Sequence, residues 1–144
     1  MCADVRIHGS CVARDGAGVL IVGASGAGKS DLTLRLLGRG FTLVADDQVD
    51  IADGRARAPD ALAGLLEVRG IGVVRLPYTS DIKLNVVIAL TDQPERLPMP
   101  ERHPQLDLPV VHLQAAGASA PDRVALALDC ALGRVSQNVG AFVA

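Results

Sequence analysis

The sequence is poor in aromatic side chains and has no excess of basic residues. Tryptophan is absent, and the aromatic residues are Phe41, Tyr78 and Phe142. Among the 144 residues, 14 lysines and arginines stand against 16 aspartates and glutamates, which gives a formal net charge of −2. Nucleic-acid binders typically carry stacking platforms or a basic stripe. Because both features are missing, we expect no nucleic-acid partner.

Paired cysteines and long apolar runs are also missing. No run approaches the roughly 20 apolar residues that a membrane span needs, and the first residues lack the basic-then-apolar pattern of a signal peptide. Cys2, Cys11 and Cys130 are widely spaced and odd in number, so they indicate neither a metal site nor a disulfide framework. We therefore expect a cytoplasmic protein with reduced thiols and no membrane partner.

What the sequence does contain predicts an α/β fold. Apolar residues make up 49% of the chain and charged residues 21%, which suits one globular domain over residues 1–144. The runs 41–45 and 49–51 are expected to form a hairpin, and the stretches 55–64 and 91–109 to hold little regular structure. The expected strands are 5–13, 18–22, 41–45, 49–51, 65–68, 72–76, 83–90 and 110–113, and the expected helices are 29–37 and 121–132.

A phosphate loop follows the strand expected at 18–22. Glycines at such a loop let backbone N–H groups turn toward phosphate oxygens, and the dipole of the following helix favours the anion. Lys29 can reach the β- and γ-phosphates, and the Ser30 hydroxyl can ligate Mg²⁺. The pattern predicts nucleotide-phosphate binding without naming the reaction. Its residues are Gly23, Ala24, Ser25, Gly26, Ala27, Gly28, Lys29 and Ser30, a full match to G-x-x-x-x-G-K-S.

Two apolar runs end in aspartate, and either could supply the metal-binding aspartate of a strand end. Asp46 and Asp47 follow the run 43–45 and form the stronger candidate, whereas Asp92 follows the run 87–90. Adjacent residues of a strand point to opposite faces. We therefore expect Asp46 and Asp47 to have separate roles.

Glu67 and Arg69 share one face of an extended segment. One interpretation is a buried ion pair or a plain edge strand. The other is a metal-binding carboxylate with a cation that meets phosphate charge. The residues alone leave both open, and they give His8, His103 and His112 only structural or surface roles.

Several of these segments together resemble the catalytic domain of HPr kinase/phosphorylase. The resemblance rests on Ile7-His8-Gly9, the phosphate loop, the stretch 39–47, and Glu67-Val68-Arg69-Gly70-Ile71-Gly72. The last segment is the specific one, because ordinary P-loop proteins lack it. The similarity runs over about residues 5 to 90. His8 stands almost at the start, so we expect a short form without the N-terminal domain of longer members.

The resemblance implies a P-loop on a fold related to phosphoenolpyruvate carboxykinase. It implies an ATP- and Mg²⁺-dependent kinase that acts on a serine of an HPr-like phosphocarrier protein of a phosphotransferase system. It also implies the reverse reaction, in which phosphate attacks phosphoserine and releases pyrophosphate. Family members form hexamers, so the resemblance implies a homo-oligomer.

The resemblance also implies roles for individual residues. His8 becomes an active-site residue, and Lys29 the phosphate-binding lysine. Ser30 and Glu67 become metal ligands, and Asp47 becomes the proton acceptor, with Asp46 beside it. Arg69 lies in the segment important to both reactions.

Two alternative functions stay open. One is a P-loop kinase of another protein or of a small molecule, and the other is a non-catalytic nucleotide-sensing module. The set Lys29, Ser30, Asp47 and Glu67 favours an enzyme, because a sensor does not need an acid/base group.

Overall fold

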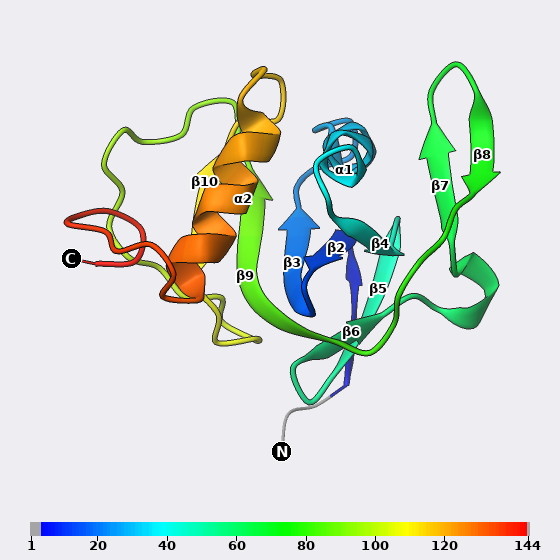
Figure 1. The fold of residues 1–144 in the computed structure, drawn as a ribbon, viewed down its shortest axis with the longest axis horizontal. Helices are drawn as coiled ribbons and strands as arrows, with labels where there is room; N and C mark the ends of the chain where they lie inside the picture. The colour runs from blue at the N-terminus through cyan, green and yellow to red at the C-terminus, as the bar shows by residue number, and fades with distance from the viewer. Residues whose placement is uncertain (1–3, 144) are drawn as a thin grey trace.

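The computed structural model describes residues 4–143 and combines two α-helices with ten strands (Figure 1). This confirms the predicted α/β class. The elements in chain order are β1 (Val5–His8), β2 (Ser10–Arg14), β3 (Ala17–Val22), α1 (Lys29–Leu37), β4 (Thr42–Ala45), β5 (Gln48–Ala52), β6 (Arg55–Arg57), the 3-10 turn η1 (Asp60–Leu62), β7 (Leu65–Val68), β8 (Gly72–Arg75), β9 (Ile82–Leu90), β10 (Val110–Leu113) and α2 (Ala120–Ala131).

An eight-stranded mixed sheet organises the chain: seven strands lie in the order β1-β5-β6-β9-β3-β2-β4, and the eighth, β10, pairs with β9 outside this order. The central strands β3 and β9 run parallel. Strand β9 pairs with β6 at its first residues and in parallel with β10 over its last four. Successive residues of β3 alternate between the two faces, and Val19, Leu20 and Ile21 are all fully buried. A strand that is apolar on both faces therefore lies at the centre of the sheet.

Both faces of the sheet are covered by apolar side chains. On one face, Leu32 and Leu36 of α1 and Leu128 of α2 pack in the same cluster as Val19 and Ile21 (Figure 1). On the other face, the outer strands supply the cover. The second cluster includes Leu20, Val44, Val49, Ile51 and Val87.

The stretch 5–13, expected to be a strand with polar breaks at His8, Gly9 and Ser10, forms two separate strands, because the chain breaks at Gly9. Strand β1 pairs with β5, whereas β2 pairs with β3 and β4. A Cβ atom at Gly9 would lie 2.6 Å from the backbone oxygen of Ile21. Only glycine allows this close approach of the two backbones.

The expected hairpin between 41–45 and 49–51 is also wrong. Strand β4 pairs with β2, while β5 pairs with β1 and β6. The hairpin forms instead between β5 and β6, at Asp53 and Gly54, whose φ angles are 52° and 73°. Two positive φ angles suit a two-residue hairpin turn. The stretch 55–64, expected to be weakly structured, therefore contains β6 and η1.

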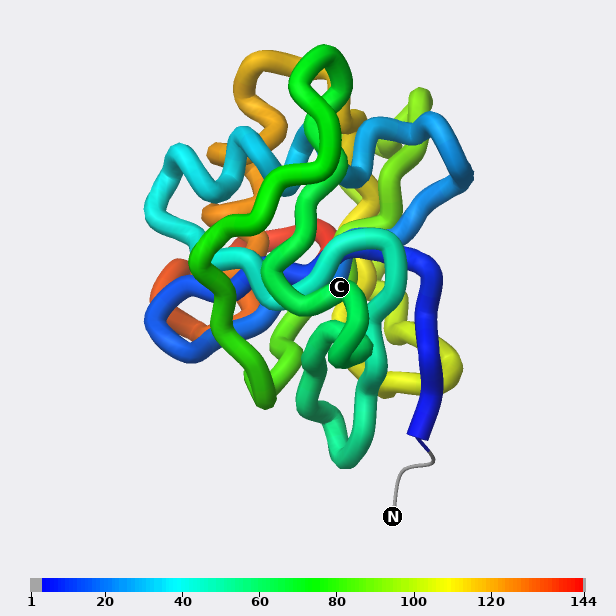
Figure 2. The backbone as a smooth tube through the Cα atoms, turned by 90° about the vertical axis from the view of Figure 1, so that its right-hand side faces the viewer, coloured from blue at the N-terminus to red at the C-terminus, as the bar shows by residue number. Residues whose placement is uncertain are grey.

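Strands β7 and β8 form a separate two-stranded sheet. This hairpin stands at one end of the molecule in Figure 1 and lies in front of the rest of the chain when the view is turned by 90° (Figure 2). It is attached through Leu66, which is fully buried, and through the Thr79 N–H, which donates to the Leu43 carbonyl at 2.8 Å. Strand β7 also contacts α1.

The stretch 91–109 contains no helix or strand, as expected from its prolines. Within residues 4–143, no helix is both long and apolar enough to cross a membrane.

Candidate active site

The phosphate loop connects β3 to α1, the context that its motif requires. Gly26 and Gly28 have φ angles of 81° and 100°, in the region that favours glycine. The Ala27 N–H donates to the Ala24 carbonyl at 3.0 Å and tightens the turn. Gly28 precedes the first residue of α1, so the loop ends at a helix N-terminus. Both sources of anion attraction, loop amides and helix dipole, therefore meet here.

Lys29 is the first residue of α1 and is buried. Its Nζ donates hydrogen bonds to the carbonyl oxygens of Gly23 at 2.8 Å and Ala24 at 3.0 Å. The Thr33 hydroxyl donates to the backbone carbonyl of Lys29 at 2.9 Å, within the first turn of α1. These contacts hold the positive charge at the loop, where a phosphate group would meet it.

Asp46 connects the end of β4 to the phosphate loop. The Ser30 hydroxyl lies 2.9 Å from its Oδ1, and the Ser10 hydroxyl donates to the same oxygen at 2.8 Å. Asp46 is only 6% exposed. A P-loop serine beside a strand-end aspartate is the arrangement with which P-loop proteins hold Mg²⁺. Sequence reasoning missed Ser10; its signal is a polar residue at the start of β2, directly before an apolar run.

Asp47, the next residue, lies in a different environment. Its side chain is 61% exposed, and its Oδ1 is 3.5 Å from Nδ1 of His8, which is also exposed. The Gly9 N–H donates to the Asp47 carbonyl at 3.1 Å. With a φ of 74°, Asp47 adopts the left-handed conformation that aspartate tolerates better than most residues. Asp46 thus faces the Ser10 and Ser30 hydroxyls, whereas Asp47 faces the solvent.

Glu67 and Arg69 share a cavity of about 520 Å³ with the phosphate loop. We call it the charged cavity, because Lys29, Asp31, Glu67 and Arg69 all line it, together with Ser30. Glu67 and Arg69 are exposed, and neither has a side-chain hydrogen bond or ion pair within residues 4–143. The interpretation as a buried ion pair is therefore wrong.

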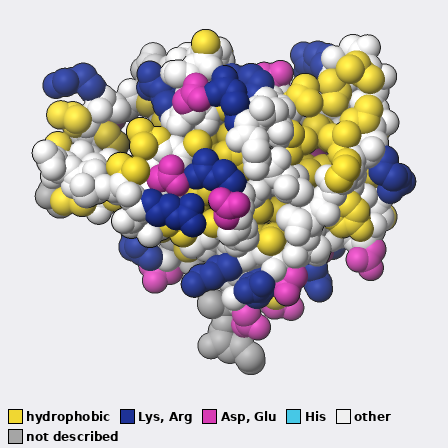
Figure 3. All heavy atoms as spheres, in the orientation of Figure 1, with side chains coloured by type: hydrophobic (Ala, Val, Ile, Leu, Met, Phe, Trp, Pro, Cys, Tyr) yellow, Lys and Arg dark blue, Asp and Glu magenta, His cyan; other side chains and the backbone are white. Residues whose placement is uncertain are grey.

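The β7–β8 hairpin carries exposed apolar side chains. Ile71 is 77% exposed and Val73 66% exposed. Hydrophobic side chains gather in the same region of the surface in Figure 3. The residues that line the charged cavity from β7 therefore adjoin an exposed apolar patch, a feature typical of surfaces that bind other molecules.

The oxygen atoms at this site suit Mg²⁺. In the part of the chain that the structure describes, no three His, Cys, Asp or Glu residues cluster to hold a metal by themselves. Mg²⁺ usually takes only one or two carboxylates and completes its shell with water and substrate phosphates. The Ser30 hydroxyl and the Asp46 and Glu67 carboxylates fit that donor set.

Other residues that the sequence singled out lie elsewhere. Asp92 lines a different cavity from Ser30 and Glu67. Nε2 of His112 lies 3.0 Å from Oε1 of Glu101. His103 Nδ1 accepts the Leu106 N–H at 3.2 Å. Both of these histidines have structural contacts.

Cys11 and Cys130 take no part in the site. Cys11 and Cys130 are free thiols, and Cys2 lies outside the described residues. Complete burial raises the pKa of the Cys11 thiol, and this protonated form is a poor nucleophile and metal ligand.

Comparison with known families identifies the chain's relatives. The family model for the HPr Serine kinase C-terminal domain matches residues 1–96. The chain belongs to this family. The fold resembles the HPr(Ser) kinase/phosphatase from Coxiella burnetii, with a TM-score of 0.72 at 24% identity, over 90% of this chain and 92% of that chain. The predicted fold is therefore confirmed as the P-loop kinase fold related to phosphoenolpyruvate carboxykinase.

Curated HPr kinase/phosphorylases are similar in sequence. The protein from Clostridium acetobutylicum is 42% identical over 98 residues, which are 60% of this chain and 32% of that protein. The protein from Clostridium novyi is 49% identical over 78 residues, which are 51% of this chain and 25% of that protein. The matched part of the chain thus spans about a third or less of these relatives.

Proposed function

We propose that this chain is an ATP- and Mg²⁺-dependent serine kinase that phosphorylates an HPr-like phosphocarrier protein of a phosphotransferase system. One observation carries the proposal: Lys29, Ser30, Glu67 and Arg69 line one cavity, and Asp46 bonds to Ser30 beside it. Family membership supports HPr as the substrate class.

The phosphate donor is held by the loop. Backbone N–H groups and the Lys29 ammonium bind the β- and γ-phosphates. Ser30 and Glu67, with Asp46 beside Ser30, would hold Mg²⁺, which neutralises charge on the phosphoryl oxygens when it is bound. Arg69 faces the same cavity and adds positive charge near the transferred group.

Asp47 is the proposed general base. As the substrate serine oxygen forms its bond to the γ-phosphorus, the bond from that phosphorus to ADP breaks and the serine proton passes to Asp47. The exposed position of Asp47, beside His8, lets a protein substrate approach it. In the reverse reaction with inorganic phosphate, Asp47 returns the proton to the serine oxygen.

The apolar patch on the β7–β8 hairpin, formed by Ile71 and Val73, supports a protein substrate over a small molecule. This patch lies on the same hairpin as Glu67, which lines the charged cavity. We also propose, by analogy with the family, that the protein acts in the cytoplasm as a homo-oligomer, as in the family's hexamers.

The test is transfer of radiolabelled γ-phosphate from ATP to a purified HPr-like phosphocarrier in the presence of Mg²⁺, followed by mapping of the modified residue. We expect label on one serine. Lys29→Ala should reduce turnover on the order of a hundredfold, because it removes a cation from the developing charge. Label on another protein or on a small molecule would contradict the substrate assignment. ATP binding without any transfer would favour the nucleotide-sensing module.

A further inference from the structure

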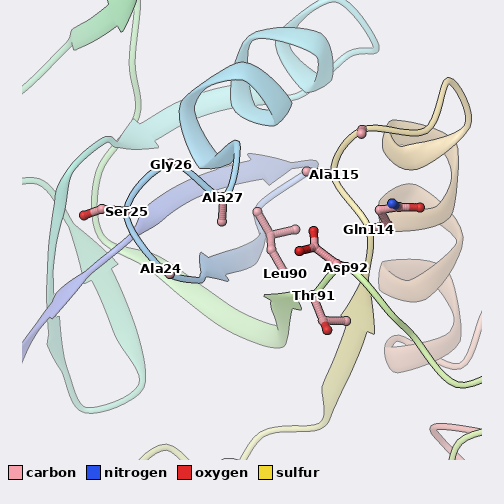
Figure 4. Close-up of a pocket in the computed structure, with 10 residues that line it drawn as sticks. Ala24, Ser25, Gly26, Ala27, Leu90, Thr91, Asp92, Gln114 and Ala115 are labelled. Atoms are coloured by element: carbon pink, nitrogen blue, oxygen red, sulfur yellow. The ribbon is translucent and has the colours of Figure 1, made fainter.

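A second cavity of about 580 Å³ lies against the phosphate loop. Three segments line it: residues 24–27 of the loop, residues 90–92 at the end of β9, and residues 114–116 after β10 (Figure 4). Gly26 is the residue that it shares with the charged cavity. A ligand that is held by the loop can therefore extend into either cavity.

The two cavities differ in chemistry. Four charged side chains line the charged cavity, which suits phosphates, a metal ion and the attacking hydroxyl. The second cavity has apolar walls from Leu90, Ala27 and Ala115, and its one charged side chain is Asp92. Small-molecule sites typically combine apolar walls with a few polar groups that fix orientation. The uncharged part of a nucleotide, its nucleoside, thus fits the second cavity better than the first.

Asp92 is the aspartate that the metal site leaves unused. Asp46 takes the hydrogen bond from Ser30, while Asp92 is exposed and has no side-chain hydrogen bond or ion pair within residues 4–143. In Figure 4 its carboxyl group points toward Leu90 and the loop. An ionised carboxylate only accepts hydrogen bonds, and a vicinal pair of hydroxyls offers two donors.

We propose that the second cavity binds the nucleoside of the phosphate donor and that the Asp92 carboxylate accepts hydrogen bonds from the ribose hydroxyls. This rests on the proposed function, because it takes ATP as the donor. Carboxylates recognise ribose hydroxyls in the same way in other nucleotide-binding folds. Leu90 and the alanines pack against the apolar faces of the nucleoside, while the triphosphate stays with Lys29.

The experiment measures binding of ATP, 2′,3′-dideoxy-ATP and inorganic tripolyphosphate, each with Mg²⁺, by calorimetry. In the wild type we expect ATP to bind roughly tenfold more tightly than the dideoxy analogue, since hydrogen bonds to a charged acceptor are lost. Asp92→Ala should bind the two nucleotides equally, at the weaker affinity. Its tripolyphosphate affinity should not fall, because the variant removes a negative charge from the vicinity of the loop.

Asp60→Ala is the matched control, because Asp60 is an exposed aspartate that lines neither of these cavities. It should keep the tenfold preference for ATP. If Asp92→Ala keeps that preference too, the inference is overturned. A parallel loss of tripolyphosphate binding would overturn it in a different way, by making Asp92 a metal or phosphate residue. A wild type that binds none of the three ligands would refute the proposed function itself, and the inference with it.

Discussion

The charged cavity has two walls, and the fold holds them differently. The first comes from the phosphate loop and α1, where the buried Lys29 is fixed by two carbonyl oxygens. Behind this wall the buried Asp46 accepts hydrogen bonds from the Ser10 and Ser30 hydroxyls. The second comes from the β7–β8 hairpin, where Glu67 and Arg69 are exposed and unpaired within residues 4–143. Lys29, Ser30 and Asp46 are therefore preorganised, whereas Glu67 and Arg69 stand on a lightly attached element.

The cause lies in the topology. The first wall follows strand β3 of an eight-stranded sheet that is buried on both faces. The second wall is a two-stranded sheet, and an isolated hairpin is marginally stable at best in water. Here Leu66 and the backbone contact to Leu43 supply the attachment. The comparison teaches that one cavity combines a wall fixed by the core with a wall held by few contacts.

The largest expected effect concerns chemistry at the edge of the first wall. Asp47→Asn keeps the size of the side chain but cannot accept a proton. We expect the rate of phosphoryl transfer to fall by roughly 10²–10⁴. ATP affinity should stay within a few-fold of the wild type, because the loop and Lys29 are intact. Rapid-quench assays and calorimetry measure the two quantities.

A normal transfer rate in Asp47→Asn would refute the assignment of the base. If ATP–Mg²⁺ binding disappears together with the rate, Asp47 is instead a metal ligand, and Asp46 and Asp47 share one role.

The second prediction compares the walls directly by hydrogen exchange. Amides of β7 and β8 should exchange at least about a hundredfold faster than those of β3 and β9, because local opening requires less buried apolar surface to be exposed. Mass spectrometry of peptides from each strand measures this. Equal protection in both regions would mean that the hairpin is part of the same cooperative unit, and the comparison would fail.

The third prediction separates metal binding from stability. Asp46→Ala and Glu67→Ala should each raise the Mg²⁺ concentration for half-maximal activity by roughly tenfold. Only Asp46→Ala should lower the melting temperature, by about 3–10 °C, because the buried Ser10 hydroxyl loses its acceptor at a cost of about 1–3 kcal/mol. A comparable loss of stability in Glu67→Ala would show that the hairpin wall is as firmly integrated as the sheet.

Local patterns allowed much of this molecule to be predicted from its sequence. The phosphate loop and α1 were placed correctly, because glycine positions, the Lys29-Ser30 pair and the spacing of Leu32 and Leu36 all lie within fifteen residues. The strands 65–68 and 110–113 were predicted with the bounds that the structure shows. In each case one short segment carries its own signal.

Contacts between distant segments were not predictable. Ser10 and Asp46 are 36 residues apart, and their hydrogen bond depends on β2 and β4 being neighbours in the sheet. The sequence suggested instead that β4 pairs with the next strand. Asp92 follows an apolar run as Asp46 does. In the structure, however, Asp92 lines the second cavity, whereas Asp46 bonds to Ser30 of the charged cavity. Strand order depends on packing over the whole sheet, which no local window contains.

The smallest expected effect lies outside both walls, at the edge of the sheet. The Arg6 guanidinium donates to both carboxylate oxygens of Asp50, at 2.6 and 3.0 Å, and joins β1 to β5. This hydrogen-bonded cation lowers the pKa of Asp50. A pKa that is lower in the folded state contributes stability above the unfolded value near 3.9, and this stability is lost as the pH falls through the folded value.

We therefore expect Asp50→Asn to reduce the urea midpoint at pH 7 by less than about 0.5 M, since exposed ion pairs contribute little. At an acidic pH below the folded pKa of Asp50, the variant and the wild type should unfold alike, because Asp50 is then protonated in both states. An equal reduction at both pH values would mean that packing, not charge, is lost. Because Asp50 lines neither wall, the Mg²⁺ requirement should not change in this variant. A changed requirement would show that the sheet edge and the charged cavity are coupled, and that the sheet wall is less rigid than its hydrogen bonds indicate.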